Sequence, residues 1–180
     1  MKIKANKLVE SLDRQNDIGE DRTGFYRLDK NERVIPFKRE FLNKIIKSIK
    51  DEDLSAYANQ SPLYDLLSKK IEINKKNILL TPGSDAAIKY IFETFVSQKD
   101  LVGFLHPTYA MIEVYAKLYG AKIFKVEYNQ NLKINYEQLD ILIKQKPKVV
   151  FLANPNQPTG TAIPDNKLDK IIKKFEASNT

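Results

Sequence analysis

The chain has 180 residues, 42% of them hydrophobic, which is enough for one domain with a buried core. The net charge is +7, but the lysines are scattered among Asp and Glu rather than gathered with aromatic residues, so solvated helix faces are favoured over a nucleic-acid surface. The absence of cysteine excludes disulfides, thiol nucleophiles and cysteine-based zinc sites, and the single histidine, His106, excludes a histidine metal cluster.

The N-terminal residues lack the continuous apolar run of a secretory signal. No later segment approaches the length of a membrane span either. We therefore expect a cytoplasmic protein without a membrane or nucleic-acid partner and without a metal.

Two amphipathic helices are predicted after an irregular arm at residues 1–37. Apolar residues recur at helical spacing from Lys38 to Ile49, and a second apolar stripe begins at Pro62 and continues to Ile71. Residues 1–55 are expected to form the arm and a helix of a small domain. Residues 56–180 are expected to form part of a larger domain.

Short apolar runs and helical stripes alternate in the rest of the chain. Asn135 and Gln138 resemble a capping box at the start of one helix. Strands that alternate with helices indicate right-handed crossovers, so the predicted fold class is α/β, a mostly parallel sheet with helices on both faces, which looks unfinished where the chain stops. The strands are expected at residues 77–81, 101–105, 121–127 and 149–153, and the helices at 84–97, 108–119, 135–145 and from Pro164 onward, with Leu168, Ile171, Ile172 and Phe175 inward.

The loop at the end of the first predicted strand contains Gly83, Ser84 and Asp85. Ligands of an open α/β sheet bind beyond the carboxyl ends of the strands, so this loop lies where a ligand is expected. A helix begins at Ser84, and its unpaired N–H groups would attract an anion. The alternative is that Ser84 or Asp85 only caps the helix.

Two further loops at the same edge have unusual sequences. Tyr109 lies at a helix start, where its ring would either stack on a planar cofactor or pack in the core, and His106 is expected to be a loop histidine rather than an acid or base. The loop from Asn154 to Gly160 holds two prolines, two asparagines and Gln157, which would fix the backbone and aim amide side chains into a cleft.

Together these loops resemble the fold type I pyridoxal-phosphate enzymes, in particular the histidinol-phosphate aminotransferase group of class I/II aminotransferases. The resemblance spans nearly the whole chain. It is carried by Leu28-Asp29-Lys30-Asn31-Glu32, Ala56-Tyr57, Ile78 to Asp85, Pro107-Thr108-Tyr109 and Asn154 to Gly160.

The resemblance implies that pyridoxal 5'-phosphate is the cofactor. The backbone and side chains of Ser84 and Asp85, together with Gly83, would hold its phosphate, and Tyr109 would stack on its pyridine ring. Its phenolic oxygen is normally bonded by an Asn immediately before Pro-Thr-Gly, whereas this chain has Gln157 there. Shifts of about an ångström cost roughly a hundredfold in rate, so either the cleft is reshaped or Asn156 shares the role.

The resemblance also implies a homodimer, in which Tyr57 would reach the phosphate of the partner subunit. Asn31 would lie near the substrate. The segments that carry the Asp partner of the pyridine nitrogen, the Schiff-base Lys and the substrate-binding arginines are not found in these 180 residues. We therefore assign no lysine as catalytic, and expect an N-terminal fragment that is inactive alone.

The activity that the resemblance implies is transamination in amino-acid biosynthesis, from a small-molecule amino donor to a 2-oxo acid. The donor stays open, because the arm after Asn31 and Glu32 departs from the usual pattern. One alternative is a decarboxylase of the same family, which transfer of an amino group to a keto acid would distinguish. The other is a non-catalytic basic α/β module, which would bind DNA in a salt-dependent manner and retain no cofactor.

Overall fold

The structure, a computed structural model, describes residues 6–10, 12, 21–28 and 30–178. The chain divides into two compact units, Met1–Arg14 with Thr81–Thr180 and Gln15–Leu80. The domain boundary expected between residues 55 and 56 falls inside the second of these units and stays a prediction. No helix in the described ranges is long and apolar enough to cross a membrane.

The unit Gln15–Leu80 contains the two helices predicted after the arm. These are α2 (Arg39–Ser48) and α3 (Ser61–Ile71), and short 3-10 turns follow them at η1 (Asp51–Leu54) and η2 (Lys75–Asn77). Pro62 lies in the first turn of α3, as its missing N–H favours. No residue of either helix is buried, so their apolar stripes stay exposed.

The first predicted strand, at residues 77–81, is wrong. Ile78, Leu79 and Leu80 follow η2 without joining a sheet, and the Leu80 N–H donates to the Tyr64 hydroxyl at 3.1 Å. A short apolar run becomes a strand only where a neighbouring strand offers backbone partners, which the periodicity of the run does not report. The sheet of the described residues therefore has three strands rather than four.

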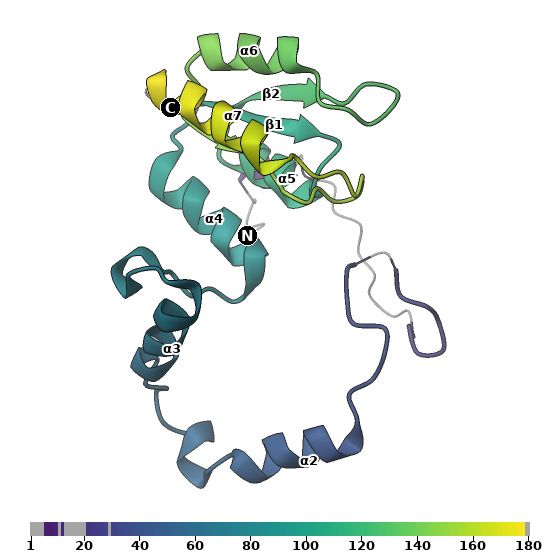
Figure 1. Cartoon of the computed structure of the whole chain (residues 1–180), viewed down its shortest axis with the longest axis vertical. Helices are drawn as coiled ribbons and strands as arrows, with labels where there is room; N and C mark the ends of the chain where they lie inside the picture. The colour runs from purple at the N-terminus through teal and green to yellow at the C-terminus, as the bar shows by residue number, and fades with distance from the viewer. Residues whose placement is uncertain (1–5, 11, 13–20, 29, 179–180) are drawn as a thin grey trace, which may run out of the picture. The chain divides into compact units, whose positions relative to one another are not determined.

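The other three strands are confirmed and form a parallel sheet in the other unit, with the order β2-β1-β3. Figure 1 shows β1 and β2 side by side. They are β1 (Leu101–His106), β2 (Lys122–Glu127) and β3 (Val149–Phe151). β1 is paired on both sides, with Val102 opposite Ile123 on β2 and Val149 on β3. Because all three strands run the same way, the loops that follow them leave from one edge of the sheet.

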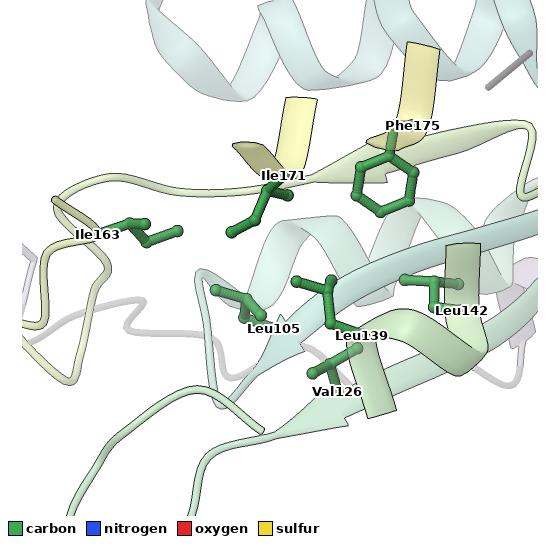
Figure 2. Packing of buried hydrophobic residues seen from close by; sticks show 7 residues of the cluster. All are labelled: Leu105, Val126, Leu139, Leu142, Ile163, Ile171 and Phe175. Atoms are coloured by element: carbon green, nitrogen blue, oxygen red, sulfur yellow. The ribbon is translucent and has the colours of Figure 1, made fainter. Parts of the chain in front are cut away.

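Helices cover both faces of this sheet, which confirms the predicted α/β class. One cluster, which includes Leu105 of β1, gathers side chains of α6 (Tyr136–Lys144) and α7 (Asp165–Ala177), and Figure 2 shows its seven buried residues. The other includes Val102 and Phe104 of β1 and gathers side chains of α4 (Gly83–Phe95) and α5 (Ala110–Leu118). The short helix α1 (Lys7–Glu10) contacts α5. Successive residues of β1 thus enter opposite clusters, as the alternation of a strand requires.

Two details of the helices differ from the sequence expectation. The Asn135 side chain accepts from the Gln138 N–H at 3.1 Å, but the Gln138 side chain accepts from the Glu127 N–H of β2 at 2.7 Å, so only half of the capping box forms. The Gln138 side chain instead connects α6 to the sheet. Ile172, expected inward, is 42% exposed, whereas Ile171 and Phe175 of α7 are buried.

Gly103, at the centre of β1, tests the packing of α6 on the sheet. A Cβ added there would overlap both methyl carbons of Leu142, which is fully buried. We expect Gly103→Ala to lower the free energy of unfolding by about 1–3 kcal/mol, measured by urea denaturation of the chain.

The control is the double variant Gly103→Ala with Leu142→Ala. Leu142→Ala alone should cost about 2–5 kcal/mol, because it leaves a cavity. The two costs should not add, since the shorter side chain relieves the overlap. Strict additivity would show that Gly103 and Leu142 do not compete for the same space.

Candidate functional site

The start of α4 offers unpaired backbone donors. Its N-cap is Pro82, which has no capping side chain, and Ser84 and Asp85 lie inside the first turn, so the alternative that either of them caps the helix is wrong. The Gly83 N–H donates to the Thr81 carbonyl at 2.7 Å, whereas the N–H groups of Ser84 and Asp85 are too close to the helix start for an intrahelical acceptor. These two N–H groups and the positive end of the helix dipole favour an anion.

Gly83 is needed for its backbone angle rather than for space. Its φ is +85°, and an added Cβ would meet nothing within 4 Å. A side chain at this left-handed φ would strain the turn that delivers the chain into α4. Glycine here therefore sets the direction of the free N–H groups.

Asp85 is half-buried, and its Oδ1 is a buried oxygen that has no hydrogen-bond partner among the described residues. A buried acceptor without a donor costs free energy, so this oxygen has capacity for a donor that the described protein does not provide. A carboxylate accepts hydrogen bonds and does not donate them to an anion. The fit of Asp85 to a phosphate therefore depends on its N–H rather than on its side chain.

Tyr109 is the N-cap of α5 rather than a member of its first turn. The residue is half-buried and packs against the cluster that contains Phe92 and Val102. The core-packing alternative is therefore part of its role, although the residue stays partly exposed.

His106 is the last residue of β1 rather than a loop residue. Its Nδ1 lies 2.9 Å from Glu127 Oε2, and Glu127 is its register partner on β2. The histidine ring is thus already engaged at the carboxyl end of the sheet.

The loop that follows β3 closes on itself through backbone and side-chain bonds. Asn154 pairs with the backbone of Ile163, donating to its carbonyl at 3.2 Å and accepting from its N–H at 2.7 Å. Two residues along, the Asn156 N–H donates to the Thr161 carbonyl at 2.8 Å, and the Gly160 N–H donates to the Asn156 carbonyl at 2.8 Å. The loop is therefore a fixed structure, as its prolines predicted.

The side chain of Asn156 is buried, with 3% exposed, and connects this loop to the loop after β1. Its Oδ1 accepts from the Thr108 hydroxyl at 2.6 Å, while its Nδ2 donates to the Pro107 carbonyl at 2.9 Å and to the Thr159 hydroxyl at 2.8 Å. The expectation that all the amides of this loop point into a cleft is thus too broad, because those of Asn154 and Asn156 are bonded within the protein. Gln157 is exposed, and unlike the other two its side chain makes no hydrogen bond within the described chain.

Tyr57 and Asn31 lie in the unit Gln15–Leu80, and both are exposed. Asn31 has a φ of +54°, next to Glu32, which pairs with Arg22 at 2.7 Å and with Arg27 at 3.5 Å. The roles that the resemblance implies for Tyr57 and Asn31 stay predictions. Within the described ranges, no group of three or more His, Asp or Glu residues is placed to hold a metal ion.

Sequence reasoning missed the threonines of this site. Thr108 bonds Asn156 across 48 residues of chain, and the hydroxyls of Thr159 and Thr161 lie 2.7 Å apart in the same network. A pairing between distant loops leaves no periodic signal in the sequence. The nearest hint was that Thr108 and Thr159 belong to the two segments that carry the resemblance.

A family model described as aminotransferase class I and II matches residues 23–180. The chain is 33% identical over 152 residues to the histidinol-phosphate aminotransferase of Caldanaerobacter subterraneus subsp. tengcongensis, which covers 83% of this chain and 43% of that protein. It is 32% identical over 150 residues to the histidinol-phosphate aminotransferase of Clostridium novyi, with 82% and 42% covered. The chain therefore spans about two fifths of the length of the curated relatives it matches.

Among solved structures, the histidinol-phosphate aminotransferase of Sinorhizobium meliloti in complex with pyridoxal-5'-phosphate matches with a TM-score of 0.67. The match covers 76% of this chain and 37% of that chain, at 20% sequence identity. At this identity the likeness concerns the fold, and it agrees with the parallel sheet and its covering helices.

Proposed function

Because the chain belongs to the aminotransferase class I and II family, we propose that its protein transfers an amino group from an amino acid or amino-alcohol phosphate to a 2-oxo acid, as histidinol-phosphate aminotransferases do. The cofactor is pyridoxal 5'-phosphate. When bound, it supplies an electron-withdrawing ring that stabilises negative charge at the carbon next to the amino group. Within this protein, residues 1–55 form the arm and a small-domain helix, and residues 56–180 form part of the cofactor-binding domain.

The observation that carries this proposal is the start of α4. The free N–H groups of Ser84 and Asp85 and the Ser84 hydroxyl are donors at the positive end of a 13-residue helix, and Gly83 turns the chain into it. A phosphate is a doubly charged acceptor that such a helix start favours. These groups bind and orient the cofactor by its phosphate.

The ring is held by the loops after β1 and β3, at the carboxyl edge of the sheet. The accessible part of Tyr109 stacks on the pyridine ring, and the amide of Gln157 bonds the phenolic oxygen. Gln157 carries the same donor and acceptor groups as the usual Asn, one methylene farther out, and no protein partner in the described chain competes for them. Asn156 has no such freedom, because both of its N–H groups are already donated within the protein.

The remaining chemistry comes from outside these 180 residues. We assign to other segments of the protein the lysine that carries the cofactor, the carboxylate that keeps the pyridine nitrogen protonated and the arginines that bind the substrate. Tyr57 reaches the phosphate in the partner subunit of a cytoplasmic homodimer, and Asn31 lies near the substrate. Transfer of an amino group to a 2-oxo acid by the full-length protein separates this function from the decarboxylase alternative.

The phosphate assignment is tested by Ser84→Glu in the full-length protein. A carboxylate at the start of α4 would repel the phosphate, so the dissociation constant for pyridoxal phosphate, measured by absorbance titration, should rise by more than about tenfold, or 1.4 kcal/mol. Ser84→Ala removes a single hydroxyl and should cost less.

Thr94→Glu is the matched charge control, because Thr94 is exposed near the other end of the same helix. It should bind the cofactor like the wild type. Unchanged affinity in Ser84→Glu would show that the phosphate does not bind at this helix start.

The role of Gln157 is tested by replacing its amide. Gln157→Asn keeps the donor and acceptor groups and should retain activity, whereas Gln157→Leu should lower kcat by about ten- to a hundredfold, since a positioned bond to the ring is lost. Gln157 is exposed, so thermal unfolding of both variants should stay close to that of the wild type. Full activity of the Leu variant would mean that this side chain does not bond the cofactor oxygen.

A further inference from the structure

Asn156 is the one buried polar residue in the described parts of the chain, and its three side-chain bonds join two loops that are far apart in the sequence. Two of the three bonds cross from the loop after β3 to the loop after β1, to Thr108 and to the carbonyl of Pro107. The third, to Thr159, stays within its own loop. A buried amide bonded in this way specifies one arrangement of its surroundings, because breaking any bond leaves a polar group without water.

The orientation of this amide follows from the chemistry of its partners. The Pro107 carbonyl only accepts, so Nδ2 must face it, and Oδ1 then faces the Thr108 hydroxyl, which donates. Both hydrogens of Nδ2 are used, the second by Thr159. A cofactor oxygen that needed a donor from Asn156 would have to displace one of these buried bonds.

We infer that Asn156 is a positioning residue that ties the two ring-binding loops together and does not itself contact the cofactor. This inference rests on the proposed function of the site. Asn156 is the immediate neighbour of Gln157, and its partner Thr108 is the immediate neighbour of Tyr109. The Thr108–Asn156 bond therefore sets the separation between the ring that stacks on the cofactor and the amide that bonds its phenolic oxygen.

Both ends of this tie are held by the backbone as well. Asn156 exchanges backbone bonds with Thr161 and Gly160, each 2.8 Å long, and the Tyr109 carbonyl accepts from Ile112 in the first turn of α5 at 3.1 Å. Because neither end can rotate freely, loss of the connecting bond changes where Gln157 and Tyr109 lie relative to each other. Misplacement of reacting groups by about an ångström is enough to lower the rate roughly a hundredfold.

The test changes Thr108 rather than Asn156. Thr108→Val removes the donor hydroxyl at nearly constant shape and leaves the Asn156 amide in place, so any direct contact between Asn156 and the cofactor would survive. Thr108→Ser keeps the hydroxyl and is the matched control. If Thr108→Val does not fold, Thr108→Ala removes the same hydroxyl without adding a methyl group.

The first readout needs no cofactor. It is hydrogen exchange of the backbone N–H groups of Asn156 and Gly160 in the full-length apoprotein, with the Lys122 N–H, bonded to Asp100, as an internal reference. In Thr108→Val we expect exchange at Asn156 and Gly160 to be about tenfold faster, or 1.4 kcal/mol less protected, while Lys122 stays unchanged. Thr108→Ser should exchange like the wild type.

The second readout is the dissociation constant for pyridoxal phosphate, which should rise about tenfold in Thr108→Val and stay unchanged in Thr108→Ser. Unchanged exchange and affinity in Thr108→Val would overturn the inference that the Thr108–Asn156 bond holds the two loops together. Faster exchange with unchanged affinity would show that the Thr108–Asn156 bond holds the loops but does not position Tyr109 and Gln157 for the cofactor.

Failure of the proposed function looks different, because the wild type itself would then not bind pyridoxal phosphate. In that case the exchange data still decide whether the two loops are tied.

Discussion

The candidate site depends on the pairing of β1 with a parallel strand on each side. β1 is the only strand of the described sheet with two neighbours, and Val102, Phe104 and Leu105 in it are almost completely buried. Its residues alternate between the two clusters, so α4 and α5 pack on one face and α6 and α7 on the other. Parallel pairing then brings the loop after β1 and the loop after β3 to the same edge, where a single buried amide can join them.

The proposed binding groups come from both backbone and side chains. At α4 the groups proposed to bind the phosphate are main-chain N–H donors, which Gly83 aims and which no capping side chain occupies. In the loop after β3, the amides of Asn154 and Asn156 are bonded within the protein, and that of Gln157 has no partner in the described chain. A site that must hold a charged, planar cofactor benefits from this separation, since binding groups are precise only when other residues fix them.

Most helices and strands could be predicted from the sequence, because the spacing of nearby apolar residues determines them. Helical spacing gave α2, α3 and α7 to within a few residues, and short apolar runs between helices gave the three parallel strands. The run at Ile78 to Leu80 was misassigned, because strand formation depends on a partner strand that a local pattern does not contain. Ile172 was placed inward for a similar reason, since the width of a buried stripe is set by what packs against it.

Within the site, the loops could be located in the sequence but the roles inside them could not. Asn154, Asn156 and Gln157 are chemically alike, and only the fold shows that the first two are bonded to Ile163 and Thr108. The capping box at Asn135 failed in the same way, because the Gln138 side chain found a better-placed partner in β2. The role of an amide side chain can be assigned only when its hydrogen-bond partners are known, and those partners are often distant in the chain.

We propose that these residues bind the cofactor but do not supply the lysine that carries it. The most direct measurement is to incubate the 180-residue chain with pyridoxal phosphate, reduce the mixture with borohydride and identify the modified lysines by mass spectrometry, with an amino-transfer assay on the same sample. We predict weak adducts scattered over surface lysines and no transfer to a 2-oxo acid. One stoichiometric adduct on a single lysine together with measurable transfer would contradict the claim, because the complete catalytic apparatus would then lie within this chain.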